Sequence, residues 1–95
     1  MYKVLIKKRA KRFFDELSAK SRKIVEKHIR TLIESPYPDE GRGDKKMLKF
    51  KSREVYRMHV GRSYTIFYEI YEEEKVVEIL NMLTIEEAHK LYGRL

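Results

Sequence analysis

Residues 55–70 read VYRMHVGRSYTIFYEI, which alternates large apolar with polar side chains on both sides of a Gly-Arg-Ser turn. Because successive side chains of a strand point to opposite faces, this pattern predicts a β-hairpin. Tyr56, Met58 and Val60 share the apolar face of its first strand, whereas Arg57 and His59 stand together on the other. The returning strand supplies a matching apolar row, so we expect half of an antiparallel sheet with one open face that could bind an anion.

Helical spacing takes over after a short strand expected at residues 2–7. Apolar residues recur at three- and four-residue intervals from Ala10 and again over residues 24–33, with a break or bend at residues 18–21. The two segments predict an antiparallel pair of helices, each with an apolar side that can pack on the sheet.

Three strands and a short helix complete the expected order. Beside the hairpin, a near-continuous apolar run at residues 76–83 predicts a central strand, and Thr84 is placed to cap a last helix. Residues 47–51 alternate apolar with basic residues and lead into the hairpin through a turn or short edge. The order βααβββα predicts one α+β domain over residues 1–95, an antiparallel sheet with a two-helix hairpin packed on one face and a short C-terminal helix.

Charge and composition narrow the class of partner. A net charge of +7 and a pI near 9.6 favour nucleic acid, an anionic membrane surface or an acidic protein segment. The chain has no cysteine, which excludes disulfides and thiolate chemistry and fits a reducing cytosol. The N-terminal apolar run is too short for a signal peptide, and no stretch approaches the roughly 20 apolar residues of a membrane span. We therefore expect a cytoplasmic protein that uses no membrane.

Residues 56–68 resemble the hairpin Tyr-Arg-apolar-Arg-apolar-Gly-Asp-Tyr-Arg-apolar-apolar-Tyr that recurs in the RelE/ParE superfamily of toxins from type II toxin–antitoxin systems. Residues 32–36, residues 47–49 and Tyr92 also fall where that family would place them, so the resemblance covers almost all of the chain. It implies the βααβββα fold and a toxin neutralised by a cognate acidic antitoxin. For RelE-like members it implies ribosome-dependent cleavage of messenger RNA, and for ParE-like members inhibition of DNA gyrase without nuclease activity.

The resemblance places Arg57 and His59 where RelE has catalytic basic residues. Metal-free RNA cleavage needs a base for the 2′-hydroxyl, cations for the charged phosphorane and an acid for the leaving oxygen. We expect His59 to act as the base, Arg57 as a phosphate clamp, and Tyr92 to stack on a base or donate a proton. The expected RNA contacts are Lys49, Lys51, Arg53 and Arg62, and we expect the alternation of residues 47–51 to set Lys49 and Lys51 beside His59. In the competing interpretation, His59 is only a solvated residue of the sheet, and the basic residues around it only keep the protein soluble.

Neither a metal ion nor a small-molecule cofactor is expected, because the three histidines are far apart in sequence and no metal-binding spacing is present. The match to RelE breaks at Thr65 and at Ile85, where nucleases of the family carry basic residues. Our leading hypothesis is a RelE-like toxin that acts on messenger RNA in the ribosomal A site. The alternatives are a ParE-like or attenuated toxin that binds a protein such as DNA gyrase, and a basic RNA-binding module without toxicity.

Overall fold

The computed structural model describes residues 1–38 and 44–92, the last of these by its backbone alone. Eight elements follow one another along the chain: β1 (Lys3–Ile6), α1 (Lys8–Asp15), α2 (Ala19–Glu34), β2 (Lys45–Phe50), β3 (Arg53–Val60), β4 (Tyr64–Tyr71), β5 (Val76–Thr84) and α3 (Ile85–Tyr92). The strands form one sheet in the order β1-β5-β4-β3-β2, in which only the β1–β5 pair is parallel. The predicted α+β class is confirmed.

One strand was not predicted. Residues 45–50 do not merely lead into the hairpin but pair with β3 over their whole length as β2, which gives the sheet a fifth strand at its edge. This strand was missed because three of its six residues are lysines, which are unusual in a central strand but common on an exposed edge strand. The observed order is therefore βααββββα.

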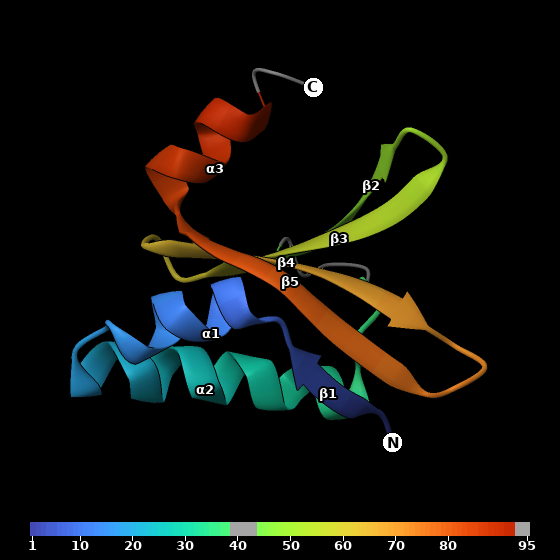
Figure 1. Cartoon of the computed structure of the whole chain (residues 1–95), viewed down its shortest axis with the longest axis horizontal. Helices are drawn as coiled ribbons and strands as arrows, with labels where there is room; N and C mark the ends of the chain where they lie inside the picture. Colours follow the sequence, from blue (N-terminus) through green and yellow to red (C-terminus); the bar gives the residue numbers. More distant parts are fainter. Residues whose placement is uncertain (39–43, 93–95) are drawn as a thin grey trace.

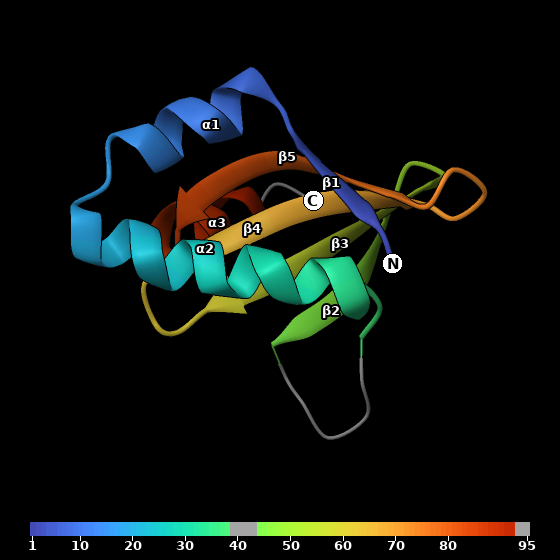
Figure 2. The same cartoon turned by 90° about the horizontal axis from the view of Figure 1, so that it is seen from below.

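Helices cover the two faces of the sheet unequally. α1 and α2 lie against one face, and α3 lies on the other side of the sheet (Figures 1 and 2). The buried positions Val25 and Leu32 on α2 recur at helical spacing, so the helix presents one apolar side to the strands. None of the described helices is long and apolar enough to cross a membrane.

The core lies between α1, α2 and the sheet. Alternate residues of β3 and β4 face it, and Met58, Ile66 and Tyr68 have no exposed surface. On β5 a bulge shifts this alternation, because the pairing passes from Phe67↔Asn81 to Tyr68↔Ile79 and leaves one residue of β5 unpaired. As a result, Ile79 and Met82 both face the core, although simple alternation would place residues three apart on opposite faces.

Side chains close the helix ends. Ser18 precedes α2 and its Oγ accepts a hydrogen bond from the Ser21 N–H at 3.2 Å. At α3 the predicted cap is confirmed and is reciprocal: Thr84 Oγ1 accepts from the Glu87 N–H, and the Glu87 carboxylate accepts from the Thr84 N–H. The C-terminal end of α2 is closed by Lys45, an almost fully buried residue whose ammonium donates to the Ser35 carbonyl at 2.9 Å.

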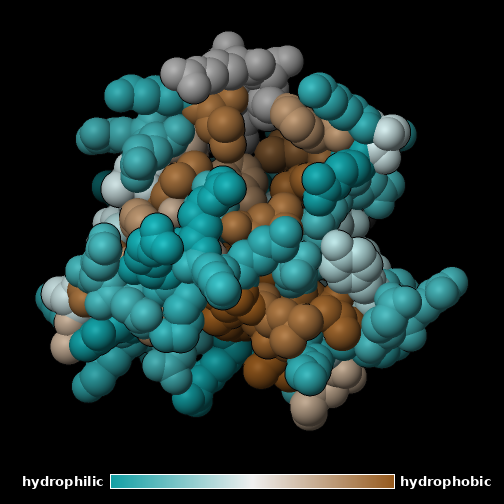
Figure 3. Space-filling model, in the orientation of Figure 1, coloured by the Kyte–Doolittle hydropathy of each residue, from teal (hydrophilic) through white to brown (hydrophobic). Residues whose placement is uncertain are grey.

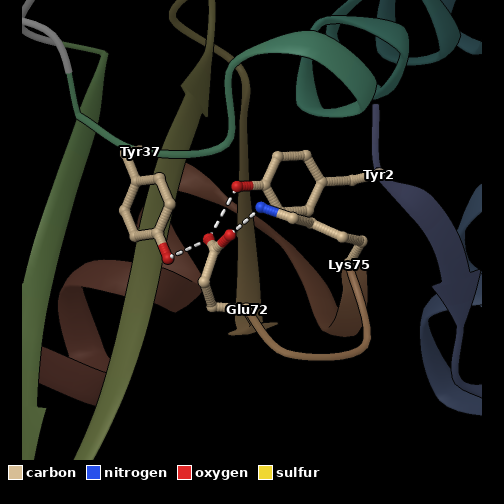
Figure 4. A network of polar contacts seen from close by, with 4 residues as sticks. All are labelled: Tyr2, Tyr37, Glu72 and Lys75. Atoms are coloured by element: carbon tan, nitrogen blue, oxygen red, sulfur yellow. Dashed lines mark hydrogen bonds and ion pairs between the residues drawn. The ribbon is translucent and has the colours of Figure 1, made fainter.

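A shared carboxylate ties three distant segments together (Figure 4). Glu72, in the β4–β5 turn, accepts hydrogen bonds of 2.7 Å from the hydroxyls of both Tyr2 and Tyr37 and pairs with Lys75. The Lys75 ammonium also lies 5.1 Å from the centre of the Tyr2 ring. Lys75 and the two hydroxyls lower the pKa of Glu72 to about 2. This network joins the start of β1 to the segment that follows α2.

Candidate active site

Arg57 and His59 lie on the face of β3 that α1 and α2 leave uncovered. Both are half-buried, whereas their neighbours Met58 and Val60 are at most 1% exposed on the opposite face. The strand register sets Arg57 opposite Phe67 of β4, and His59 opposite Thr65. The predicted hairpin therefore brings the arginine and the histidine to one surface, as its alternation requires.

Thr65 fixes the histidine ring. His59 Nδ1 lies 3.1 Å from Thr65 Oγ1, and Thr65 is fully buried, so the hydroxyl is held in place by its surroundings. The backbone N–H of His59 donates to the Asp44 carbonyl at 2.8 Å. Burial, and then the positive charges of Arg57 and of His89 on α3, lower the pKa of His59, with the Asp44 carboxylate acting in the opposite direction. The folded chain thus favours the neutral imidazole, the form that can accept a proton.

Lys46 is a residue of this surface that sequence reasoning missed. It lies on β2 directly opposite Arg57, on the same face of the sheet. Two lysines are adjacent at this point, and only the strand pairing separates their roles. Lys45 turns into the core to bond the end of α2, and Lys46 turns outward. Lys46 could have been identified from the sequence only by predicting the pairing of β2 with β3.

The expectation that alternation sets Lys49 and Lys51 beside His59 is wrong. Lys49 pairs with Glu54 and therefore points to the face opposite Arg57. Lys51 lies outside the strands, in the β2–β3 turn, where it and Ser52 adopt positive φ values of 49° and 70°. The reason is the register of the hairpin, because a turn centred on residues 51–52 pairs every odd position of β2 with an even position of β3.

The other predicted site residues lie apart from one another. Arg53 makes a two-fold ion pair with Glu69, through Nη2 at 2.7 Å and Nε at 3.0 Å, so its guanidinium is already engaged. Arg62 is exposed in the β3–β4 turn. Tyr92 is the last residue of α3, and its side chain lies outside the described part of the structure. Ile85, where the resemblance breaks because nucleases of the family carry a basic residue, begins α3 and donates its N–H to the Ser63 carbonyl at 3.0 Å.

The arrangement favours acid–base chemistry on an anion. An imidazole with a lowered pKa, held through one ring nitrogen, lies beside an arginine on the same strand, and a lysine lies across from that arginine. Arginine offers paired donors and lysine a compact charge, which together suit a phosphate group. In the described ranges, no three His, Asp or Glu side chains gather into a cluster that could hold a metal ion.

Comparison with known proteins gives one family match and several solved structures of similar fold. The family model described as the ParE toxin of the type II toxin-antitoxin system parDE matches residues 4–87. The chain is similar to the archaeal RelE–RelB complex structure from Pyrococcus horikoshii OT3, with a TM-score of 0.73, 24% identity, and 87% of this chain and 93% of that chain covered. No curated protein sequence matches.

Two further structures are close in fold. The toxin–antitoxin complex RelBE2 from Mycobacterium tuberculosis gives a TM-score of 0.70 at 23% identity, covering 87% of this chain and 96% of that one. The YoeB/ParE toxin from Agrobacterium tumefaciens gives 0.69 at 14% identity, covering 86% and 96%. At these identities the likeness establishes the fold, and the residues of the open face must carry any argument about chemistry.

Proposed function

Since the chain belongs to the ParE toxin family of type II toxin–antitoxin systems, within the RelE/ParE superfamily, we propose that it is a RelE-like toxin that cleaves messenger RNA on the ribosome. One observation carries this proposal: His59, fixed by Thr65 and with its pKa lowered by burial and by the charge of Arg57, stands beside Arg57 on the open face of the sheet. A general base and a phosphate-binding cation are two of the three groups that metal-free cleavage of RNA requires, the third being an acid for the leaving oxygen.

In the proposed reaction, His59 takes the proton of a 2′-hydroxyl through Nε2, the ring nitrogen that Thr65 does not contact. The 2′-oxygen forms a bond to the adjacent phosphorus, and the bond from phosphorus to the 5′-oxygen breaks. Arg57 and Lys46 stabilise the charge on the phosphorane. The leaving 5′-oxygen takes up a proton, which we assign to Tyr92 or to a ribosomal group. The products carry a 2′,3′-cyclic phosphate and a 5′-hydroxyl.

We further propose a cognate acidic antitoxin as the inhibitor. The charge of +7 favours an acidic segment, and the exposed edge strand β2 offers unpaired backbone groups for strand addition. The similar structures from Pyrococcus horikoshii and Mycobacterium tuberculosis are complexes of a toxin with its antitoxin, which is consistent with this partner.

Primer extension on purified ribosomes loaded with a defined messenger RNA tests the activity. We expect the wild-type chain to cut the transcript at the A-site codon and His59→Gln to cut it 10²–10⁴-fold more slowly, roughly the usual contribution of a general base. His28→Gln is the matched control, because His28 lies on α2 with its Nδ1 2.9 Å from the Ile24 carbonyl, away from the open face. A transcript left intact by the wild-type chain, or equal rates for His59→Gln and wild type, would overturn the proposal.

A protein-targeting toxin is the second candidate, favoured by Thr65. This residue stands where the resemblance predicts a nuclease arginine, and it is fully buried, so it contributes no cation to the open face. A gyrase supercoiling assay distinguishes the two candidates. If the protein inhibits supercoiling at concentrations that leave transcripts intact, the ParE-like activity is favoured. If it cleaves transcripts and leaves supercoiling undisturbed, the ParE-like activity is excluded.

A further inference from the structure

An apolar groove opens on the same face of the sheet, next to Arg57. It has a volume of about 310 Å³ and is lined by side chains of four strands and of both α1 and α3. Figure 3 shows apolar side chains gathered in the hollow between α3 and the β2–β3 hairpin, with hydrophilic side chains on either side. Leu48, Val55 and Phe67 form its sheet side, and Leu91 of α3 its far wall. The groove is a continuation of the candidate active site, because Val55 and Arg57 are alternate residues of one strand face.

The bulge in β5 brings a polar group into this groove. Because Phe67 pairs with Asn81 and Tyr68 with Ile79, the bulged pair Leu80 and Asn81 both line the groove, where an unbroken strand would turn one of them away. The Asn81 side chain is half-buried, and its Oδ1 accepts a hydrogen bond from the Met82 N–H at 3.0 Å. That bond engages the amide oxygen, so Nδ2 is the donor that this side chain can offer to a ligand in the groove.

An exposed aromatic ring and two arginines complete the rim. Phe50 ends β2 with 39% of its surface exposed, at the mouth of the groove and opposite Arg53 in the register. Arg9, from the first turn of α1, lines the groove from the other side. Arg53 is already paired with Glu69, so Arg9 is the rim cation that can meet a phosphate. An apolar slot with one amide, an exposed phenylalanine and this arginine matches the needs of a nucleotide, whose base stacks on aromatic rings while its phosphates pair with arginine.

We propose that the groove binds one base of the RNA, that of the nucleotide next to the scissile phosphate, with Phe50 stacking on the ring and Asn81 hydrogen-bonding its edge. This inference rests on the proposed function. Arg57 and Val55 lie about 7 Å apart along β3, so a phosphate held by Arg57 places the neighbouring base at the groove. Asn81 then sets which base is preferred, and Phe50 contributes affinity that is independent of sequence.

Mapping the cut sites of substituted chains on a mixed set of transcripts tests this assignment. We expect Asn81→Ala to lower the preference among the four bases at one position beside the cut by roughly 10-fold, since one base-edge contact is lost. We expect Phe50→Ala to lower cleavage of all transcripts by about 10-fold through the lost stacking. Met47→Ala is the matched control, because Met47 is on the same strand with a similar exposure of 40% but faces the other way.

The outcomes separate the two proposals. If the wild-type chain does not cut RNA, the proposed function fails. If the wild-type chain cuts and Asn81→Ala keeps the same base preference, the groove assignment fails while the function stands. Thermal unfolding of each variant excludes loss of the fold as the cause of a lowered rate.

A binding measurement addresses the groove without any cleavage. The four ribonucleoside monophosphates are titrated one by one against the wild-type chain, and the methyl resonances of Leu48, Val55 and Leu91 are followed by NMR. We expect these methyls to shift most with one or two of the four nucleotides in the wild-type chain, and to shift to a similar extent with all four in Asn81→Ala. Methyl shifts produced only by an acidic antitoxin peptide, and by none of the nucleotides, would overturn the assignment in favour of a protein occupant.

Discussion

The two faces of β3 show how one strand serves folding and chemistry at once. Met58 has no exposed surface and packs beneath the helices, whereas Arg57 and His59, its neighbours in sequence, lie half-buried on the open face. The covered face holds the apolar core, with the almost fully buried Lys45 of β2 at its edge. The open face combines cations, a histidine and an apolar groove with the buried Thr65 and Phe67 of β4.

This difference teaches that stability and activity can be changed separately at adjacent positions. The covered face gains its stability from apolar burial, at about 25 cal/mol for each Å² removed from water. The open face sets Arg57 opposite Lys46, where like charges repel, so this pair is held in place by the rest of the sheet and not by its own attraction. Substitutions on the two faces should therefore affect different measurements.

The largest effect on stability is expected from Met58→Ala. Truncating this fully buried side chain leaves a cavity, and we expect the free energy of unfolding to fall by about 2–5 kcal/mol. Arg57→Ala, one residue away, should change it by no more than about 0.5 kcal/mol. Urea unfolding followed by circular dichroism measures both, and equal losses for the two variants would refute the division between the faces.

A smaller loss is expected from Tyr68→Phe. The Tyr68 hydroxyl is buried and donates to the Pro36 carbonyl at 2.6 Å, so its removal leaves a buried acceptor unpaired. We expect a cost of about 1 kcal/mol in urea unfolding. Tyr64→Phe is the control, because its hydroxyl makes a longer contact of 3.3 Å to Ser21 and lies only partly buried. A cost for Tyr64→Phe as large as that for Tyr68→Phe would contradict this explanation.

The turns that join the strands belong to neither face. Ser52 has a φ of 70°, which glycine adopts without strain, and we expect Ser52→Gly to raise the free energy of unfolding by about 0.5 kcal/mol. Gly61 is the mirror case. Its φ is 59°, and an added Cβ would meet nothing within 4 Å, so Gly61→Ala should cost about 1 kcal/mol through the backbone alone. Thermal unfolding measures both, and shifts of the same sign would disprove the assignment.

The smallest effect concerns protonation on the open face. Because burial and the charges of Arg57 and His89 lower the pKa of His59, the unfolded chain binds this proton more tightly than the folded one. The contribution of His59 to the free energy of unfolding is therefore complete above about pH 6.5 and is lost as the pH falls below that value. NMR titration of the imidazole should give a pKa below 6.5, raised in Arg57→Ala and unchanged in Arg62→Ala. A pKa of 6.5 or above in the wild-type chain is the contrary result.

The sequence was sufficient for the parts of the fold that rest on local alternation. The two faces of β3, the helix pair and the cap at Thr84 follow from period and residue type. The site residues were harder to predict, because only the β2–β3 register decides that Lys46, and not Lys49, lies on the face of Arg57. That register depends on a turn of two non-glycine residues with positive φ, a conformation that their sequence does not indicate. The bulge that turns Asn81 into the groove has no signal in an apolar run. The periodicity of single elements could thus be predicted from the sequence, whereas the register between strands could not.

The chemistry of the cut ends tests the central claim most directly. If His59 and Arg57 promote attack by the 2′-hydroxyl, every cut made on the ribosome should leave a 2′,3′-cyclic phosphate on one fragment and a 5′-hydroxyl on the other. Ligation by an RNA ligase that requires these two ends, followed by sequencing, identifies them. We expect ligated junctions at A-site codons with the wild-type chain and a 10²–10⁴-fold decrease, roughly, with His59→Gln. Intact transcripts, or fragments that carry a 5′-phosphate, would contradict an RNA-cleaving role for the open face.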